Sequence, residues 1–197
     1  MPLTEPGHEA HLLIFARVPA LGRVKSRLAA GVGQPAALAI YPELLAITRT
    51  AAVAAEVPTT DEAQEWAGMT TRCQPAGDLG ERMTAAFAAA FAAGASRVAI
   101  IGTDCPGLRA EHLTQAFALL AEHDVVLGPA TDGGYYLLGL RQPQPELFQN
   151  KEWSTETVLA DTVADAHRLG RRVALLPELR DVDTAADLAV WRTEVPV

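Results

Sequence analysis

The stretch Val98-Ala-Ile-Ile-Gly-Thr-Asp-Cys-Pro106 carries the strongest structural signal in the chain. Four consecutive apolar residues are typical of a strand that is buried on both faces, as in the parallel sheet of an α/β domain. The strand must end before Pro106, because proline cannot donate to a sheet ladder. Ligands bind beyond the carboxyl ends of such strands. Asp104 is therefore expected either to hold a hard divalent cation or to cap the helix that comes next.

Strand and helix patterns alternate on both sides of this stretch. Compact apolar runs predict strands at 11–17, 98–102, 124–128, 135–140 and 172–176, and longer patterned segments predict helices at 24–30, 35–52, 78–94, 110–122, 155–169 and after 183. Pro42 is expected to kink or restart its helix, and the ambiguous segment 53–75 offers only a weak strand at 53–57. This order predicts one α/β domain over residues 11–197, with a loose N-terminal tail at 1–10.

Composition and charge narrow the class of protein. The 197 residues, of which 49% are hydrophobic and 20% charged, suit a single globular domain with a sizeable core. The net charge of −8 argues against nucleic acid or an anionic membrane as a partner. The apolar region 83–102 fits a helix followed by a strand better than a membrane span. Two cysteines without metal-like spacing favour a reducing, cytoplasmic setting.

A basic segment, Gly22-Arg-Val-Lys-Ser-Arg-Leu28, comes after the first predicted strand. Its three cations, Arg23, Lys25 and Arg27, lie where the N-terminus of a helix already favours anions. The segment predicts a phosphate-binding site, although a solvated basic turn would have the same composition. It is not a Walker P-loop, because Val24 stands where that motif has a glycine.

Two further loops each allow a functional and a structural interpretation. In Gly77-Asp-Leu-Gly-Glu-Arg-Met83, Arg82 could reach an anion, whereas Asp78 and Glu81 have the spacing of a capping box. Cys105 could be a nucleophile, but no histidine is arranged as its partner, and a small buried hydrophobe is the favoured interpretation.

Acidic residues come after two more predicted strands. Asp132, with Gly133 and Gly134, either lies against a substrate or forms an Asp-Gly hairpin turn. Asp181 and Asp183 end the last strand, where the alternative role is capping of the terminal helix at Asp183 or Thr184. If these carboxylates converge, their repulsion raises at least one pKa unless a cation neutralises them, so a shared Mg²⁺ or Mn²⁺ is expected. Together with the basic loop, they predict a nucleotide held between cations and a metal.

Six segments between about Leu12 and Leu188 form one ordered set: FARVPALGRVKSRLA, GDLGERM, IIGTDCPGL, VVLGPATDGGYYLLGL, WSTETVL and DVDTAADL. The set resembles that of the bacterial rSAM/selenodomain-associated transferases, GT-A-like glycosyltransferases linked to arsenosugar biosynthesis. That family belongs to the nucleotide-diphospho-sugar transferase superfamily, which also contains guanylyltransferases acting on molybdopterin and phospholactate. The resemblance implies a single GT-A-like α/β domain with a mostly parallel central sheet flanked by helices.

The resemblance also implies a role for individual residues. Asp104 would bind the metal, with Asp183 matching the second metal ligand of the sugar-activating cytidylyltransferases in a VDT-type turn. The usual Asp-x-Asp of GT-A enzymes is Asp104-Cys105-Pro106 here, so one of its acids is missing. The WST segment would lie on the acceptor side, although an N-cap at Ser154 also explains part of that signal.

We therefore expect a metal-dependent transferase that uses a nucleotide-activated substrate and a small-molecule acceptor. Glycosyl transfer from a nucleotide-diphospho-sugar is the leading reaction, nucleotidyl transfer with release of pyrophosphate is the alternative, and a catalytically silent nucleotide-binding module is the third hypothesis. The assigned residues are Lys25 and Asp132 for catalysis; Gly22, Arg23, Lys25, Arg27, Asp78 and Arg82 for the nucleotide and its phosphates; Asp104 and Asp183 for Mg²⁺ or Mn²⁺; and Gly133, Gly134, Trp153, Ser154 and Thr155 for the acceptor side.

Overall fold

A six-stranded sheet runs through the middle of the protein, with strand order β2-β1-β3-β5-β4-β6. The computed structural model describes residues 10–55, 59–60 and 72–194. The strands are β1 (Ala10–Ile14), β2 (Thr59–Thr60), β3 (Arg97–Ile101), β4 (Val125–Pro129), β5 (Tyr135–Leu140) and β6 (Val173–Leu175). Among these strands β5 alone runs against its neighbours, so the mixed sheet is mostly parallel, as expected.

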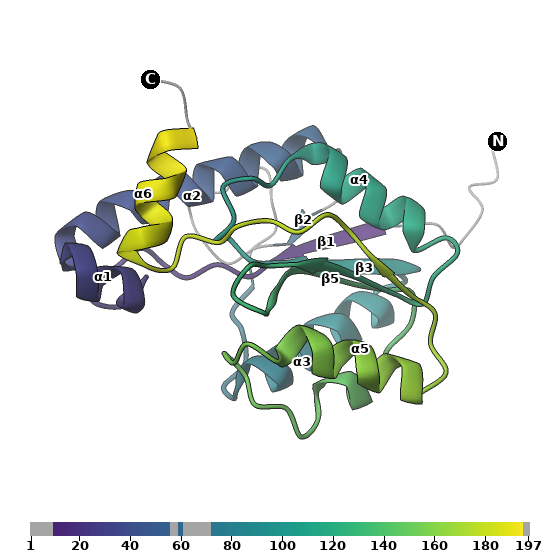
Figure 1. Cartoon of the computed structure of the whole chain (residues 1–197). Coiled ribbons are helices and arrows are strands. Elements are labelled where there is room, and N and C mark those ends of the chain that lie inside the picture. The colour runs from purple at the N-terminus through teal and green to yellow at the C-terminus, as the bar shows by residue number, and fades with distance from the viewer. Residues whose placement is uncertain (1–9, 56–58, 61–71, 195–197) are drawn as a thin grey trace.

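Helices cover both faces of the sheet and give the protein three layers (Figure 1). They are α1 (Ser26–Val32), α2 (Gln34–Ala54), α3 (Leu79–Ala92), α4 (Ala110–Leu119), α5 (Val158–Arg168) and α6 (Ala185–Glu194), with a short 3-10 turn η1 (Pro145–Phe148). Figure 1 shows α2 and α4 on one face and α3 and α5 on the other. The α1 and α6 helices lie together at one end, where both pack near the start of α2.

The central strand β3 shows why a continuous apolar run forms this sheet. Its side chains alternate, so Val98 and Ile100 pack in the cluster that contains α3 and α5, while Ala99 and Ile101 pack in the cluster that contains α2 and α4. From Val98 to Ile101 every side chain of β3 is buried, so these four positions are left to apolar residues. The prediction of a doubly buried strand at this point is therefore confirmed.

Three expectations about the N-terminal half need correction. The first strand begins at Ala10, one residue earlier than expected, and residues 1–9 of the expected tail lie outside the described residues. The expected restart at Pro42 is wrong, since one helix runs from Gln34 to Ala54 with the exposed Pro42 inside it and with Tyr41, Leu44 and Leu45 buried. The expected strand at 53–57 is wrong at its start, since Val53 is helical, and residues 56–58 lie outside the described part.

The α2 helix is, among the described helices, the one that is long and apolar enough to cross a membrane, with a mean hydropathy of 1.3. This observation rests on length and composition alone, and core helices of globular proteins pass the same test. In this protein Ile40, Leu44 and Thr48 are buried in the fold, so the helix has a packed face.

Candidate active site

The carboxyl ends of β1, β3, β4 and β6 meet at one edge of the sheet, on the side of α1 and α6 in Figure 1. The loops beyond these ends carry a group of charged residues that are far apart in the sequence. Lys25 comes after β1, Asp104 after β3, Asp132 after β4, and Asp181 and Asp183 after β6. The parallel strands therefore assemble one site from four loops, as the sequence predicts.

Lys25 is the cation at the centre of this group. Its side chain is only 3% exposed, and its ammonium lies 2.6 Å from Asp104 Oδ1. The same Nζ donates to Asp183 Oδ1 at 3.0 Å and to the carbonyl of Val182 at 2.8 Å. A lysine has three donors, so all of them are matched here. Burial alone would lower the pKa of Lys25, but Asp104 and Asp183 outweigh it and raise that pKa above its usual value.

The carboxylates outnumber the cations on the β4 and β6 side. One oxygen each of Asp132, Asp181 and Asp183 lies within 4.8 Å of the others. Asp181 is buried and accepts a hydrogen bond from Thr131 Oγ1 at 3.0 Å. Burial raises the pKa of Asp181, and the charge of Asp132 raises it further. Arg27 is half-exposed and reaches only to 3.5 Å from Asp183 Oδ2.

We call Asp132, Asp181 and Asp183 the acidic cluster. Carboxylate oxygens are the ligands that Mg²⁺ and Mn²⁺ prefer, and histidine and thiolate are absent from this set. Burial is the main reason why the pKa of Asp181 is raised, the charges of Asp132 and Asp183 add to the rise, and the hydrogen bond from Thr131 only partly opposes it. The donor chemistry of the acidic cluster therefore fits a hard divalent cation.

The backbone holds these loops in register. Val182 N donates to the carbonyl of Asp104 at 2.9 Å, which ties the loop after β6 to the loop after β3. Thr131 N donates to the carbonyl of Leu179 at 3.1 Å, which ties the loop after β6 to the loop after β4 as well. The carboxylates therefore lie on loops that are joined to each other and not only to their own strands.

The structure decides against helix capping as the role of Asp183 and Asp104. The cap of α6 is at Thr184, whose Oγ1 accepts from Asp187 N at 3.2 Å, while Asp187 Oδ2 accepts from Thr184 N at 2.8 Å and from Asp183 N at 3.2 Å. The carboxylate of Asp183 is thus available to Lys25. The N-cap of α4 is Arg109, so Asp104 does not cap that helix either.

Cys105 is buried directly beside this site. Burial raises the pKa of its thiol well above the usual value, and the negative charge of Asp104 raises it further. A thiol that stays protonated is a poor nucleophile. The interpretation of Cys105 as a small buried hydrophobe therefore agrees with the structure.

The loop before α3 is held by its own contacts. Asp78 and Glu81 form the expected capping box, with two hydrogen bonds of 2.9 Å. Arg82 donates twice to the carbonyl of Gly77, at 2.9 and 2.7 Å. The structural interpretation of Asp78 is confirmed, and a role of Asp78 or Arg82 in nucleotide binding stays a prediction.

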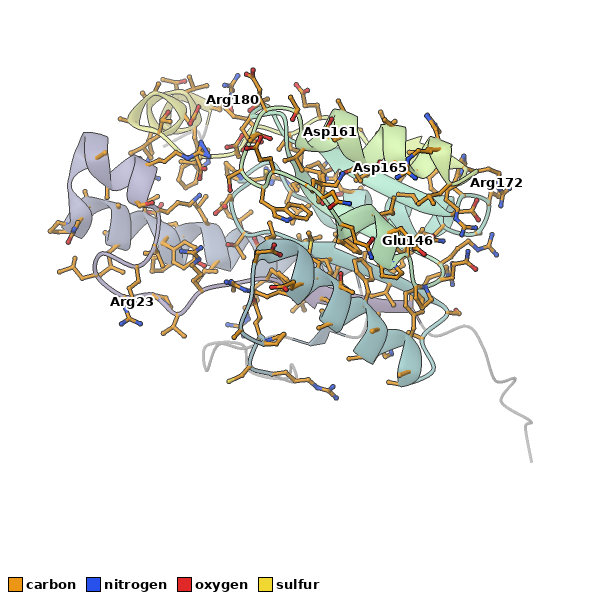
Figure 2. All side chains as sticks on the ribbon, turned by 90° about the horizontal axis from the view of Figure 1, so that it is seen from below. Arg23, Glu146, Asp161, Asp165, Arg172 and Arg180 are labelled. Atoms are coloured by element: carbon orange, nitrogen blue, oxygen red, sulfur yellow. The ribbon has the colours of Figure 1, made fainter. Side chains whose placement is uncertain are left out.

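Two residues of the basic loop also stay outside the charged group. Figure 2 shows the side chain of Arg23 pointing away from the loop that carries it, and the residue is exposed. Gly22 has a left-handed φ of 74° and lies beside the side chain of Gln34. Of the six residues assigned to the nucleotide and phosphates, Lys25 and Arg27 are the ones that the described contacts join to the carboxylates.

The acceptor-side residues form a second group that touches the first. Gly133 has a left-handed φ of 86°, and a Cβ at this position would overlap the backbone of Glu156. Gly134 N donates to Asp132 Oδ1 at 2.8 Å, so Asp132 stabilises its own turn. This turn joins the antiparallel strands β4 and β5, so the hairpin interpretation is confirmed. The same turn nevertheless carries Asp132 to the acidic cluster.

The segment 153–156, which we call the strap, packs on Gly80 of α3 at one end and on Gly133, in the turn after β4, at the other. Trp153 packs against Gly80, where a Cβ would lie 2.7 Å from the indole ring. Ser154 has a left-handed φ of 66° and stands three residues before the N-cap of α5, so the expected N-cap at Ser154 is wrong. The N-cap of α5 is Thr157, and Thr155 Oγ1 donates to the carbonyl of Glu152 at 2.9 Å.

On the sequence alone, Asp181 is noted, but Asp104 and Asp183 are the residues assigned to the metal. The signal that could have added Asp181 is the alternation in Asp181-Val182-Asp183, where Val182 is fully buried. Side chains two residues apart in an extended segment point to the same side. Both carboxylates then lie on the side opposite to Val182, in agreement with the short distance between their oxygens.

Comparison with known proteins agrees with this architecture. Residues 39–155 match the profile of a family described as "Uncharacterized protein conserved in bacteria (DUF2064)". The chain belongs to this family. No curated protein matches the chain.

Solved structures with a similar fold extend the comparison beyond the DUF2064 family. A crystal structure from Desulfovibrio desulfuricans G20, described as a "putative nucleotide-diphospho-sugar transferase", is 32% identical, with a TM-score of 0.87 over 95% of this chain and 88% of that chain. The 4-diphosphocytidyl-2C-methyl-D-erythritol synthase of Anaerococcus prevotii DSM 20548 is 11% identical, with a TM-score of 0.63 over 95% and 98%. A Mycobacterium tuberculosis H37Rv protein in complex with manganese is 13% identical, with a TM-score of 0.52 over 94% and 98%. The expected superfamily fold is confirmed, and the first two of these neighbours are described as a putative transferase and a synthase.

Proposed function

We propose that this protein is a metal-dependent transferase that acts on a nucleotide-activated substrate, and that it transfers a glycosyl group from a nucleotide-diphospho-sugar. The observation that carries the proposal is the convergence of Lys25, Asp104 and the acidic cluster at the carboxyl edge of the sheet. Ligands bind at this edge in open α/β sheets. The 32% identical neighbour, described as a "putative nucleotide-diphospho-sugar transferase", supports the choice of donor.

The chain offers a cation site and an anion site side by side. Asp104, Asp181 and Asp183 would hold Mg²⁺ or Mn²⁺, which leaves Asp132 to the acceptor, and the fold neighbour solved with manganese supports the choice of metal. A divalent cation at this place would stabilise the negative charge that develops on a departing diphosphate. Arg27, half-exposed beside Asp183, can turn its guanidinium toward a phosphate, which it matches with two parallel hydrogen bonds.

Asp132 is the residue that we propose as the acceptor base. It is exposed, and its Oδ1 is held by Gly134 N, so the orientation of the carboxylate is fixed while Oδ2 faces no described hydrogen-bond donor. It belongs both to the acidic cluster and to the turn whose Gly133 packs against Glu156. Asp132 can therefore accept the proton of an acceptor hydroxyl next to the place where the diphosphate would leave.

The choice of glycosyl transfer over nucleotidyl transfer rests on the description of the 32% identical neighbour. The cations Lys25 and Arg27 would suit the phosphates of either substrate. The narrower resemblance to rSAM/selenodomain-associated transferases of arsenosugar biosynthesis, and a cytoplasmic location, stay predictions.

One assay separates the three hypotheses. The purified protein is incubated with Mn²⁺ or Mg²⁺ and with panels of nucleotide sugars or nucleoside triphosphates, each with candidate acceptors. Release of a nucleoside diphosphate from a nucleotide sugar is the expected result. Pyrophosphate would identify a nucleotidyltransferase, and binding without turnover in both panels would identify a silent module. Asp104→Asn should abolish turnover, while Glu146→Gln, on η1 (Figure 2), serves as the matched carboxylate control.

A further inference from the structure

We infer that Lys25 and the divalent cation compete for the carboxylates of Asp104 and Asp183, so that Lys25 must release both before the metal site is complete. The inference rests on the proposed function, because it concerns the same site. It goes beyond that function by assigning Lys25 to the regulation of metal binding. Lys25 acts here as a positioning residue that holds the metal ligands together until the metal replaces it.

The position of the ammonium is the first argument. Lys25 Nζ lies 2.6 Å from Asp104 Oδ1 and 3.0 Å from Asp183 Oδ1. An ion bound by both carboxylates would have to lie between the same two oxygens, at about 2.0–2.6 Å from each. The ammonium and a metal ion cannot share that space, because they would overlap and repel each other.

The hold on Lys25 is the second argument. Its side chain is 3% exposed, and its third hydrogen bond goes to the Val182 carbonyl. Its backbone is left-handed, with φ 51° and ψ 48°, a conformation that is uncommon outside glycine and asparagine. Such backbone geometry persists only where surrounding contacts impose it. The contacts with Asp104 and Asp183 are the ones that draw this side chain into the sheet edge.

The charge balance determines the consequence of releasing Lys25. Four carboxylates, from Asp104 and the acidic cluster, face two cations, Lys25 and Arg27. Withdrawal of the Lys25 ammonium leaves this group with one cation at its edge, which favours a doubly charged ion strongly. The phosphates of the donor are the acceptors to which Lys25 can move. Metal and donor phosphate should therefore each increase the affinity for the other.

The chain provides a matched control, because its only lysines are Lys25 and Lys151. Lys151 is equally buried, at 2% exposed, and its Nζ lies 3.0 Å from Asp165 Oδ2. Lys151→Met thus removes a buried ammonium from an aspartate at another place in the fold. A change that is specific to the site should appear for Lys25→Met and not for Lys151→Met.

The first experiment is a Mn²⁺ titration of the wild type, Lys25→Met and Lys151→Met without nucleotide, with free Mn²⁺ followed by electron paramagnetic resonance. We expect Lys25→Met to bind Mn²⁺ about tenfold more tightly than the wild type, and Lys151→Met to bind as the wild type does. Equal affinity of a folded Lys25→Met variant and the wild type would overturn the inference. This readout is independent of turnover, so it also separates failure of the inference from failure of the proposed function.

The second experiment uses the wild type and does not depend on the folding of any variant. Amine labelling followed by mass spectrometry reports Lys25 and Lys151 separately. We expect Mg²⁺ alone to increase the labelling rate of Lys25 about tenfold and to leave that of Lys151 unchanged. An unchanged rate at Lys25 under Mg²⁺ saturation would show that the metal binds without moving the lysine, and the inference would be wrong.

Discussion

The two lysines of this chain are both buried against aspartates, yet their surroundings differ in sign. Lys25 faces Asp104 and Asp183, with further carboxylates beside them, so negative charge is in excess there. Lys151 shares Asp165 with Arg168, so two cations contact one carboxylate there. Figure 2 shows Asp165 on α5, well apart from the loop that carries Arg23. The carboxylates around Lys25 need another cation to balance their charge, whereas Lys151 and Arg168 together balance the charge of Asp165.

The pKa shifts agree with this difference. Burial raises the pKa of Asp165, but Arg168 and Lys151 outweigh it and lower that pKa below the usual value. Burial also raises the pKa of Asp181, and there Asp132 adds to the rise instead of opposing it. Buried ion pairs are therefore not equivalent in this fold. A functional site is indicated by the pair whose charges do not balance.

The largest expected effect comes from Asp183→Asn, because Asp183 belongs to both the Lys25 contact and the acidic cluster. We expect turnover to fall by about 100-fold or more, since transition-state charge stabilisation is lost. Asp165→Asn removes the carboxylate of the other lysine and should leave turnover per folded molecule unchanged. Assays at matched concentrations of folded protein give the comparison, and similar losses in both variants would argue against a special role of the Lys25 region.

The next effect concerns stability in the absence of metal. Lys25→Met leaves Asp104 and Asp183 without their shared cation, and we expect a loss of about 3 kcal/mol in the free energy of unfolding. Lys151→Met leaves Asp165 with Arg168, and a loss of about 1 kcal/mol is expected. Urea unfolding in EDTA measures both. Addition of Mg²⁺ should restore stability to Lys25→Met alone, and an equal response of both variants would contradict the assignment.

The pH dependence of stability should have opposite signs at Asp181 and Asp165. The raised pKa of Asp181 means that its ionised form destabilises the fold as pH rises above about 4. The lowered pKa of Asp165 means that its ionised form stabilises the fold above that pH, and the contribution is lost as pH falls. In EDTA at pH 7, Asp181→Asn should therefore be more stable than the wild type and Asp165→Asn less stable.

Urea unfolding between pH 3.5 and 7 tests this contrast. Both differences from the wild type should shrink toward the acidic end, where the wild-type carboxylates become protonated. Saturating Mn²⁺ should reverse the order for Asp181→Asn, because only the wild type keeps the full acidic cluster. A metal-free Asp181→Asn variant that is less stable than the wild type at pH 7 would contradict the proposed excess of negative charge.

The smallest expected effect distinguishes the two companion arginines. Arg27 and Arg168 are 55% and 66% exposed, so either substitution by glutamine should change the free energy of unfolding by less than about 0.5 kcal/mol. Arg27→Gln should nevertheless raise the KM for the donor, because Arg27 is the exposed cation at the carboxylates. Steady-state kinetics on both variants measures this difference. A KM of Arg27→Gln equal to that of the wild type would show that Arg27 does not bind the donor's phosphates.

The strongest local patterns predicted the structure well. The apolar run at β3 and the capping box at Asp78 depend on neighbouring residues only, so the sequence contains all the information that they need. The convergence of Asp104, Asp132 and Asp183 was also predictable, because the carboxyl ends of parallel strands meet at one edge.

The remaining features depend on contacts between distant segments. The sequence shows that Lys25 is basic, but its burial results from a left-handed backbone and from partners more than 150 residues away. The left-handed Ser154 delays the start of α5 because the strap packs on Gly80 and Gly133. Polar threonines at 59–60 pair with β1, which no apolar run indicates.

The anomalous scattering of a crystal grown with Mn²⁺ tests the assignment of the site most directly. The account predicts a peak within ligand distance of Asp183 and at least one of Asp104, Asp132 and Asp181, with Lys25 Nζ moved away from Asp104. A peak at another place would contradict it, and so would a peak at this site with the contact between Lys25 and Asp104 intact.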